Sequence, residues 1–374
     1  MVDFFNSKEL LIDGVSKLKS SKIPNPEIDA RILLSYASNY QNTIYMHNDI
    51  SISKKDKNKF YCFLDKRIQG KPVSRILGSR NFWKNNFLIN KYTLDPRPDS
   101  EVIIDVLTKT CRNRSNYFQV LDLGSGSGCI GLSLIDEIKN ASLLSVDICK
   151  NSLEILNKNA NRLNLMNKLY CAQINWFEDT WIENIKIITQ NEKLFSKNKF
   201  DIIVCNPPYI KSSDIEKLQT EVKNYDPLVS LDGGIDGCDS YWVIFKDLRE
   251  LMAIDGVCFF EIGYDLLDNI KKLSVIGNAK VVATGKNLNT ESSDVADGVN
   301  TTQRFNQAQN IGTIRSNPGY TDAEETETTT VEFYFNQGSS YLRGSEKKSD
   351  RGEQFSAFVA EKNITKRNEP RTET

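Results

Sequence analysis

The residues with the clearest chemical potential are Asn206, Pro207, Pro208 and Tyr209, which directly follow the apolar run 202–205. Proline fixes its own φ and keeps the preceding residue out of the helical region, so we expect a rigid corner at the end of a buried strand. There the Asn206 side-chain oxygen and the Pro207 carbonyl can accept both hydrogens of an –NH2 group. Tyr209 offers a flat face to a planar amide or base. This segment therefore predicts catalysis on a planar amide or amino group.

A second group of candidate residues lies in a glycine-rich turn between an apolar strand and a helix. A lone turn of this kind is common, but Leu143–Val146 forms a second apolar run that ends in Asp147, 23 residues after Gly124. An acid at that place can accept both hydroxyls of a ribose. The glycines follow GxGxG rather than the GxGxxG of dinucleotide sites, which favours S-adenosylmethionine, a ligand without a pyrophosphate. The turn would face its amino-acid end, and its candidate residues are Asp122, Gly124, Ser125, Gly126, Ser127 and Gly128.

The elements that must position these residues alternate between strand and helix from residue 96 to residue 284. Helical patterns such as 129–138, 152–163 and 241–252 separate short apolar runs, which indicates βαβ units and a mainly parallel sheet. Ligands of such sheets bind at the carboxyl ends of strands, where both motifs lie. The predicted strands are Gln119–Leu123, Ser142–Asp147, Leu169–Gln173, Asp201–Cys205, Val257–Glu261 and Lys280–Ala283.

The flanking segments differ in character. Residues 1–72 carry three apolar stripes at helical spacing, around 5–18, 26–34 and 55–69, and predict a small helical domain. In residues 73–95, apolar and polar residues alternate on both sides of the turn-rich Lys84–Asn86. This pattern indicates a β-hairpin linker before the domain 96–284. Residues 285–374 are rich in polar residues and predict a largely disordered tail. Within this tail, 328–335 has the composition of a strand that adds to a sheet edge.

Composition limits the function classes. The 374 residues hold 48 Lys plus Arg and 49 Asp plus Glu, so the net charge of -1 argues against binding nucleic acid through bulk positive charge. His47 is the single histidine and no two of the eight cysteines lie within four residues of each other, so we expect no metal site. No apolar run approaches the ~20 residues of a membrane span. We expect a cytoplasmic protein without a membrane or an obligatory nucleic-acid partner.

Residues 1 to about 284 resemble the glutamine N5-methyltransferases that modify peptide chain release factors (the PrmC or HemK family). The matching segments are NPEIDARILLSYA, RIQGKPVSRILGSRNFW, TLDPRPDSE, VLDLGSGSGCIGLSL, LLSVDI, INWFED, DIIVCNPPYI and FFEIGY. The resemblance implies a Rossmann-like class I methyltransferase sheet preceded by a substrate-docking helical domain. It also implies a monomer that transfers a methyl group from S-adenosylmethionine to a glutamine in the GGQ loop of a release factor.

The resemblance also implies roles for individual residues. Trp176 would lie against the adenine, with Asn175 beside it, and Asp147 would bind the ribose. The substrate glutamine would be held by Asn206, Pro207, Pro208 and Tyr209, of which Asn206 also borders the cofactor, while Arg97, Pro98 and Glu101 border the pocket. Asn175 and Asp95 depart from the family, which usually has an acid and an apolar residue at these places. A closing antiparallel strand is also expected after 280–287, and 328–335 is the candidate to replace it.

Other functions fit parts of the pattern. Adenine-N6 methyltransferases of nucleic acids share the Asn-Pro-Pro-Tyr motif, because an exocyclic –NH2 poses the same hydrogen-bonding problem. Residues 1–284 carry 37 basic and 35 acidic residues, which does not favour that acceptor. A ribosomal-protein glutamine is a closer alternative. A decayed, non-catalytic cofactor-binding protein is the third.

Overall fold

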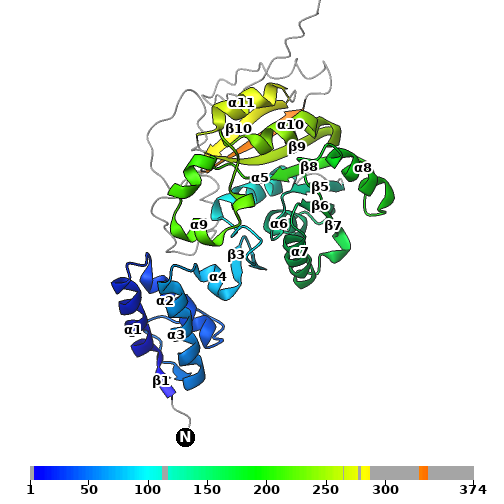
Figure 1. The fold of residues 1–374 in the computed structure, drawn as a ribbon. Coiled ribbons are helices and arrows are strands. Elements are labelled where there is room, and N and C mark those ends of the chain that lie inside the picture. The colour runs from blue at the N-terminus through cyan, green and yellow to red at the C-terminus, as the bar shows by residue number, and fades with distance from the viewer. Residues whose placement is uncertain (1–3, 112–116, 264, 277–278, 287–327, 336–374) are drawn as a thin grey trace, which may run out of the picture.

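The computed structural model describes residues 4–111, 117–263, 265–276, 279–286 and 328–335. The N-terminal helices are confirmed as α1 (Ser7–Ser20), α2 (Pro26–Ala37) and α3 (Lys54–Ile68), with the short strands β1 (Phe4–Asn6) and β2 (Ser51–Ser53) paired beside them. Asn6 and Ser53 cap α1 and α3 by accepting backbone N–H bonds, and Pro26 starts α2. Their apolar stripes meet in a core that includes Leu11, Leu33 and Phe60, so the three helices form one packed unit (Figure 1).

The predicted hairpin is present but turns one residue earlier than expected. The short helix α4 (Val73–Leu77) leads into β3 (Ser79–Phe82) and β4 (Asn85–Leu88), and the turn is Trp83–Lys84. Trp83 has a φ of 54°, which is unusual for a bulky residue. Its backbone N–H donates to Glu101 Oε1 at 2.7 Å and its indole N–H to Glu137 Oε1 at 2.8 Å. These tertiary bonds, rather than local turn residues, fix the place of the turn.

A seven-stranded sheet follows, in the order β10-β11-β9-β8-β5-β6-β7. Strands β5 to β9 run parallel, as the alternating pattern predicts. Figure 1 shows the helices on both faces of the sheet, the Rossmann-like arrangement expected from the sequence. The strands are β5 (Phe118–Leu123), β6 (Ala141–Asp147), β7 (Leu169–Gln173), β8 (Phe200–Cys205), β9 (Met252–Gly263), β10 (Ala279–Lys286) and β11 (Thr328–Phe335).

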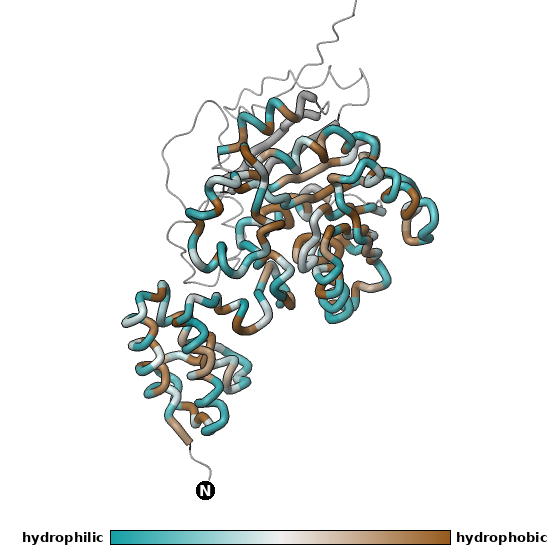
Figure 2. Tube along the Cα trace, viewed as in Figure 1, coloured by the Kyte–Doolittle hydropathy of each residue, from teal (hydrophilic) through white to brown (hydrophobic). Residues whose placement is uncertain are grey.

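Two apolar cores lie on opposite faces of this sheet. Alternation along β5 sends Val120 into one core and Leu121 into the other. One core packs against α5 (Glu101–Cys111), α6 (Cys129–Glu137) and α7 (Lys150–Arg162), and the other against α8 (Trp181–Asn191), α10 (Asp239–Leu251) and α11 (Leu267–Ile276). Figure 2 shows apolar residues along the central strands and hydrophilic residues over the outer segments.

The long connection between β8 and α10, residues 206–238, is the wall segment. It carries η3 (Ser212–Lys217), α9 (Thr220–Tyr225) and η4 (Leu228–Ser230). Glu221 of α9 forms an ion pair of 2.6 Å with the buried Arg67 of α3, which also pairs with Asp29 of α2 at 2.6 Å. This connection is therefore tied directly to the N-terminal helical unit. Two further short helices, η1 (Pro98–Ser100) and η2 (Met166–Lys168), precede α5 and β7.

The strand predicted within the polar tail exists, but it lies one position further inside the sheet than an edge. β11 runs antiparallel between β9 and β10, with Val331 opposite both Phe260 and Thr284. A strand in this place bonds on both sides, whereas an added edge strand bonds on one. The predicted disorder of the tail falls on 287–327 and 336–374, which lie outside the described residues. Within the described residues, no helix combines the length and the apolar character that crossing a bilayer requires.

Deletion of residues 324–374 is expected to lower the melting temperature by roughly 4–8 °C, which corresponds to about 2 kcal/mol for a domain of this size. The deletion removes β11 and separates β9 from β10. Deletion of 336–374 alone retains β11 and is the matched control, expected to melt with the full chain. Equal melting temperatures for both deletions in differential scanning calorimetry would show that β11 contributes nothing to stability.

Candidate functional site

A cavity of about 570 Å³ opens at the carboxyl ends of β5, β6 and β8, where the sequence motifs predicted a site. The lining comes from six separate segments of the sequence: 92–100, the glycine turn with the start of α6, the residues at the end of β6, those after β7, and 206–208 and 228–232 after β8. The predicted site residues that line it are Arg97, Gly124, Ser125, Gly126, Ser127, Asp147, Trp176, Asn206 and Pro208, and Asn175 lines it as well. Tertiary structure thus brings most of the sequence-predicted residues to one cavity.

The glycine turn owes its shape to left-handed backbone conformations and close neighbours. Gly124, Gly126 and Gly128 have φ values of 72°, 54° and 81°. A Cβ on Gly128 would lie 2.6 Å from Leu156 Cγ, so that glycine lets the turn pack on α7. A Cβ on Gly124 would lie 3.1 Å from the Trp176 ring, whereas one on Gly126 would meet nothing within 4 Å. Gly126 therefore borders open space in the cavity.

Asp147 ends β6 with its carboxylate fixed by the turn. Its Oδ2 accepts the Gly126 N–H and its Oδ1 the Cys149 N–H, both at 2.8 Å. The side chain is almost fully buried, and this burial raises the pKa of Asp147, while the two N–H bonds act in the opposite direction. Each carboxylate oxygen keeps a second acceptor position, so Asp147 can accept two neighbouring hydroxyls of a ligand in the cavity.

Trp176 supplies an aromatic wall. Its ring lies against Gly124 and at a tilt to Phe177, with 6.3 Å between the ring centroids. Its buried indole Nε1 has no hydrogen-bond partner within the described part of the chain. Asn175 uses its side-chain oxygen to accept the Phe177 N–H at 3.0 Å, which fixes the turn that presents both rings. An asparagine makes this bond as well as an acid does, so the departure at 175 preserves the local shape.

The Asn-Pro-Pro-Tyr segment leaves the end of β8 as predicted. Asn206 and Pro208 line the cavity, and Asn206 Nδ2 donates to Ser100 Oγ at 3.3 Å. The Tyr209 hydroxyl donates to Glu261 Oε1 at 3.2 Å, and this bond holds Tyr209 against β9. Burial is the main reason that the pKa of Tyr209 lies well above its usual range, which keeps the hydroxyl protonated as a donor.

Six of the sequence-predicted residues are not among those that line the cavity: Pro98, Glu101, Asp122, Gly128, Pro207 and Tyr209. Glu101 instead accepts the Trp83 N–H and joins α5 to the hairpin. Asp122 is buried beneath the turn, accepts the Gly131 N–H at 3.2 Å and secures the first turn of α6. Burial raises the pKa of Asp122 to about 7.

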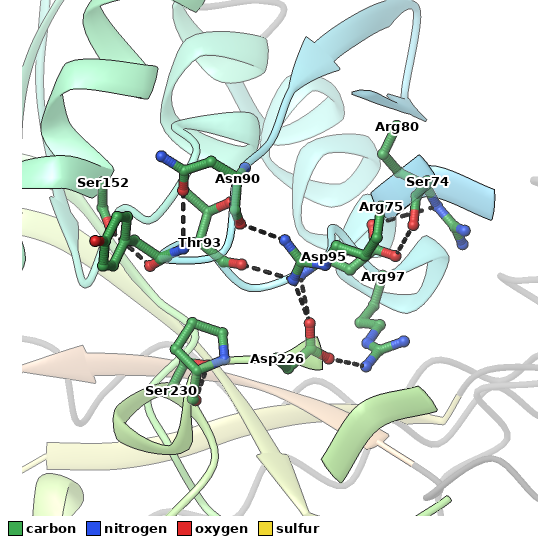
Figure 3. A network of polar contacts seen from close by, with 12 residues as sticks. Ser74, Arg75, Arg80, Asn90, Thr93, Asp95, Arg97, Ser152, Asp226 and Ser230 are labelled. Atoms are coloured by element: carbon green, nitrogen blue, oxygen red, sulfur yellow. Dashed lines mark hydrogen bonds and ion pairs between the residues drawn. The ribbon is translucent and has the colours of Figure 1, made fainter. Parts of the chain in front are cut away.

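Sequence reasoning missed a buried charge network beside the cavity (Figure 3). Asp226 of the wall segment pairs with Arg75 of α4 and, at 2.7 Å, with Arg97. Arg75 also donates to the carbonyls of Asn90 and, at 2.7 Å, Thr93. Of these residues, Arg97 was predicted at the site, through the resemblance of its segment to the family. The pairing of Arg75 with Asp226 had no local signal, because the two residues are 151 positions apart.

The same network accounts for Asp95, where the family resemblance implies an apolar residue. Asp95 is almost fully buried, and its carboxylate accepts the Ser74 hydroxyl and lies 3.9 Å from Arg80 Nε. Its backbone N–H donates to Asp226 Oδ1 at 3.2 Å. A carboxylate is therefore tolerated here because one of its oxygens accepts a hydrogen bond from Ser74 and the other lies near the Arg80 guanidinium.

Comparison with known proteins identifies the family. The family model described as the PrmC N-terminal domain matches residues 9–78, and the methyltransferase small domain matches 94–222. The release factor glutamine methyltransferase of Agrobacterium fabrum is 35% identical over 68% of this chain and 84% of that protein. The enzyme of the same name from Clostridium botulinum is 33% identical over 69% and 87%.

The relatives also include longer proteins. The bifunctional methyltransferase of Rickettsia typhi is 29% identical over 71% of this chain, which covers 52% of that protein. The chain thus matches about half the length of such bifunctional relatives and most of the length of the others. The parallel sheet with its cavity at the strand ends, the methyltransferase-domain match and these relatives agree: the chain belongs to the release factor glutamine methyltransferase family and is an S-adenosylmethionine-dependent methyltransferase.

Proposed function

We propose that this enzyme transfers the methyl group of S-adenosylmethionine to the side-chain amide nitrogen (N5) of the glutamine in the GGQ loop of a peptide chain release factor, in the cytoplasm. The observation that carries the proposal is the position of Asn206 in the same cavity as Asp147 and the glycine turn. An amide acceptor and a nucleoside-bearing donor would then meet in one enclosed volume. The names of the 31–35% identical relatives support the choice of substrate.

The residues present fit the cofactor. Gly126 borders open space, Asp147 has two acceptor positions left, and Trp176 offers a half-buried ring and an indole N–H that lacks a partner in the described chain. We assign the glycine turn to the methionine part, Asp147 to the ribose hydroxyls, and Trp176 with Asn175 to the adenine. When bound, the cofactor supplies a methyl group activated by its attachment to a sulfonium.

Asn206 and Pro207 position the acceptor nitrogen for methyl transfer. The nitrogen of an amide is a poor nucleophile because its lone pair is delocalised into the carbonyl. Asn206 Oδ1 and the Pro207 carbonyl accept its two hydrogens and orient the nitrogen toward the methyl group. The same acceptors stabilise the positive charge that grows on this nitrogen during transfer. No strong base is required, because transfer first forms a methylated amide with a positive charge on its nitrogen, and this cation is acidic enough to lose its extra proton to water.

The opening of the cavity suits a protein substrate. Three of its lining residues are large apolar side chains that remain more than half exposed: Phe177 at 55%, Leu228 at 58% and Val229 at 56%. Exposed apolar residues grouped at one opening are typical of a binding surface. We assign this rim to the backbone and flanking side chains of the glutamine-bearing loop, and the helical unit α1–α3 to the docking of the substrate protein.

Methyl transfer to a release factor tests the proposal. Purified enzyme, radiolabelled S-adenosylmethionine and a purified release factor are combined beside the release factor whose GGQ glutamine is changed to alanine. We expect label in the unchanged factor alone. Label in both factors would place the methyl group elsewhere. No label in either, with cofactor binding confirmed by calorimetry, would reject this substrate, and a ribosomal protein and an adenine-containing RNA would be tested next.

The Asp147→Ala substitution is expected to weaken S-adenosylmethionine binding by roughly 10- to 100-fold, since hydrogen bonds to a charged group contribute about 1.5–3 kcal/mol. Isothermal titration calorimetry measures this change. Asp268→Ala removes an exposed acid of α11 that does not line the cavity, and is the matched control with unchanged affinity. Unchanged affinity in Asp147→Ala would remove Asp147 from the cofactor site.

A further inference from the structure

A buried carboxyl group lies directly behind the acceptor site and has no part in the mechanism above. Glu261 of β9 is only 1% exposed. Its Oε2 accepts the Ser100 hydroxyl, and its Oε1 accepts the Tyr209 hydroxyl at 3.2 Å. Tyr241 of α10 donates to the Glu261 backbone carbonyl at 2.7 Å, which holds this part of β9 in place. Glu261 thus contacts Tyr209, at one end of the Asn206–Tyr209 segment, directly and is linked to Asn206, at the other end, through Ser100.

The hydrogen bonds that connect Glu261 with Ser100 and Asn206 have a fixed direction. An ionised carboxylate only accepts, so Ser100 must give its single hydroxyl hydrogen to Glu261. The Ser100 oxygen can then only accept, and its second partner is Asn206 Nδ2 at 3.3 Å. This contact holds the NH2 end of the Asn206 amide toward Ser100. The other end, Oδ1, is left for the cavity.

We propose that Glu261, acting through Ser100, is a positioning residue that fixes the orientation of the Asn206 amide so that its oxygen faces the –NH2 group of the substrate. The inference rests on the proposed acceptor role of Asn206. The two ends of an asparagine amide have nearly the same shape, so packing alone does not choose between them. The reversed amide would place one NH2 group against another, without an acceptor for the substrate hydrogens.

Protonation of Glu261 removes its control over the orientation of the Asn206 amide. Its surroundings contain Asp99, Arg97 and Ser100 from the segment before α5, Tyr209 and Cys205 from β8 and its end, Tyr241 from α10 and Cys129 from α6. Burial, more than any of these neighbours, raises the pKa of Glu261 to about 7. A protonated Glu261 can donate to Ser100, whose hydrogen is then available to Asn206 Oδ1. The productive amide orientation is therefore lost as the pH falls through about 7 and restored as it rises.

The side-chain amide resonances of Asn206 test this inference without a substrate. In ¹⁵N–¹H correlation spectra of the whole protein they are assigned by their loss in Asn206→Ala. We expect them to shift with an apparent pKa near 7 in the unchanged protein and in Glu250→Gln, an exposed control on α10. In Glu261→Gln and in Ser100→Ala the titration disappears. If Glu261→Gln does not fold, Ser100→Ala provides the same test. A titration that persists in the folded variants, or none in the unchanged protein, overturns the inference.

Kinetics provide the second measurement. Glu261→Gln and Ser100→Ala should each lower kcat by roughly 10- to 100-fold, because misplaced positioning groups cost about this much. The affinity for S-adenosylmethionine should stay within about twofold, since neither residue is assigned to the cofactor. The double variant should be no slower than the slower single variant, because both act on Asn206. A double variant whose kcat loss equals the product of the two single losses would overturn the inference. Absence of transfer by the unchanged enzyme would instead reject the proposed substrate, while the resonance test still decides the role of Glu261.

Discussion

Replacement of Asn206 by alanine is expected to lower kcat by roughly 100- to 1,000-fold, the usual effect of removing one group that stabilises transition-state charge. In the proposed mechanism Asn206 Oδ1 accepts one hydrogen of the substrate amide, and this bond strengthens as positive charge grows on the nitrogen. Single-turnover methyl transfer to the release factor measures the chemical step separately from product release.

The same variant should bind S-adenosylmethionine nearly as well as the unchanged enzyme does. The ribose and adenine positions are assigned to Asp147 and Trp176, and Asn206 only borders the cofactor. Asn184→Ala, which changes an exposed asparagine of α8, is the matched control and should retain full kcat. Turnover of Asn206→Ala equal to that of this control would refute the assigned role. A parallel loss of cofactor affinity would assign Asn206 to the cofactor instead of the acceptor.

The second large effect is expected on stability. Asp226→Ala should lower the free energy of unfolding by about 3–5 kcal/mol, because loss of one partner leaves a buried charge uncompensated. The Asp226 side chain is 4% exposed, and its two partners Arg75 and Arg97 are 5% and 31% exposed. Arg75 also uses its guanidinium to hold the chain at Asn90 and Thr93, so its displacement loosens the whole segment before Arg97.

Urea denaturation followed by circular dichroism measures this loss. Asp105→Ala breaks a surface ion pair with Lys109 in α5 and is the matched control, expected to cost less than about 1 kcal/mol. Equal midpoints for the two variants would show that the network around Asp226 contributes no more than a surface pair. Because Arg97 lines the cavity, the Asp226 variant should also show a raised KM for the protein substrate at temperatures where it is folded.

The sequence alone determined the elements and the local shape of the motifs. Period-two and period-3.6 apolar patterns depend on residues close in the chain, so the strands β5 to β9 and the helices α1 to α3 were predictable to within a few residues. The same holds for the corner at Asn206–Tyr209, because proline restricts the backbone locally. The GxGxG pattern of the glycine turn was enough to favour S-adenosylmethionine over a dinucleotide, and the spacing from Gly124 to Asp147 was enough to indicate a ribose site.

Tertiary structure alone decided what lies behind and beside these motifs. Nothing in the local pattern distinguishes Asp226 from an exposed loop acid or Glu261 from an ordinary strand residue. Their roles arise because Arg75 and Ser100, each more than 100 positions away, meet them in buried space. The place of β11 between β9 and β10, and the left-handed Trp83 at the hairpin turn, likewise depend on partners from other elements. Short-range patterns set the backbone, whereas desolvated long-range hydrogen bonds and ion pairs determine which polar groups support the site.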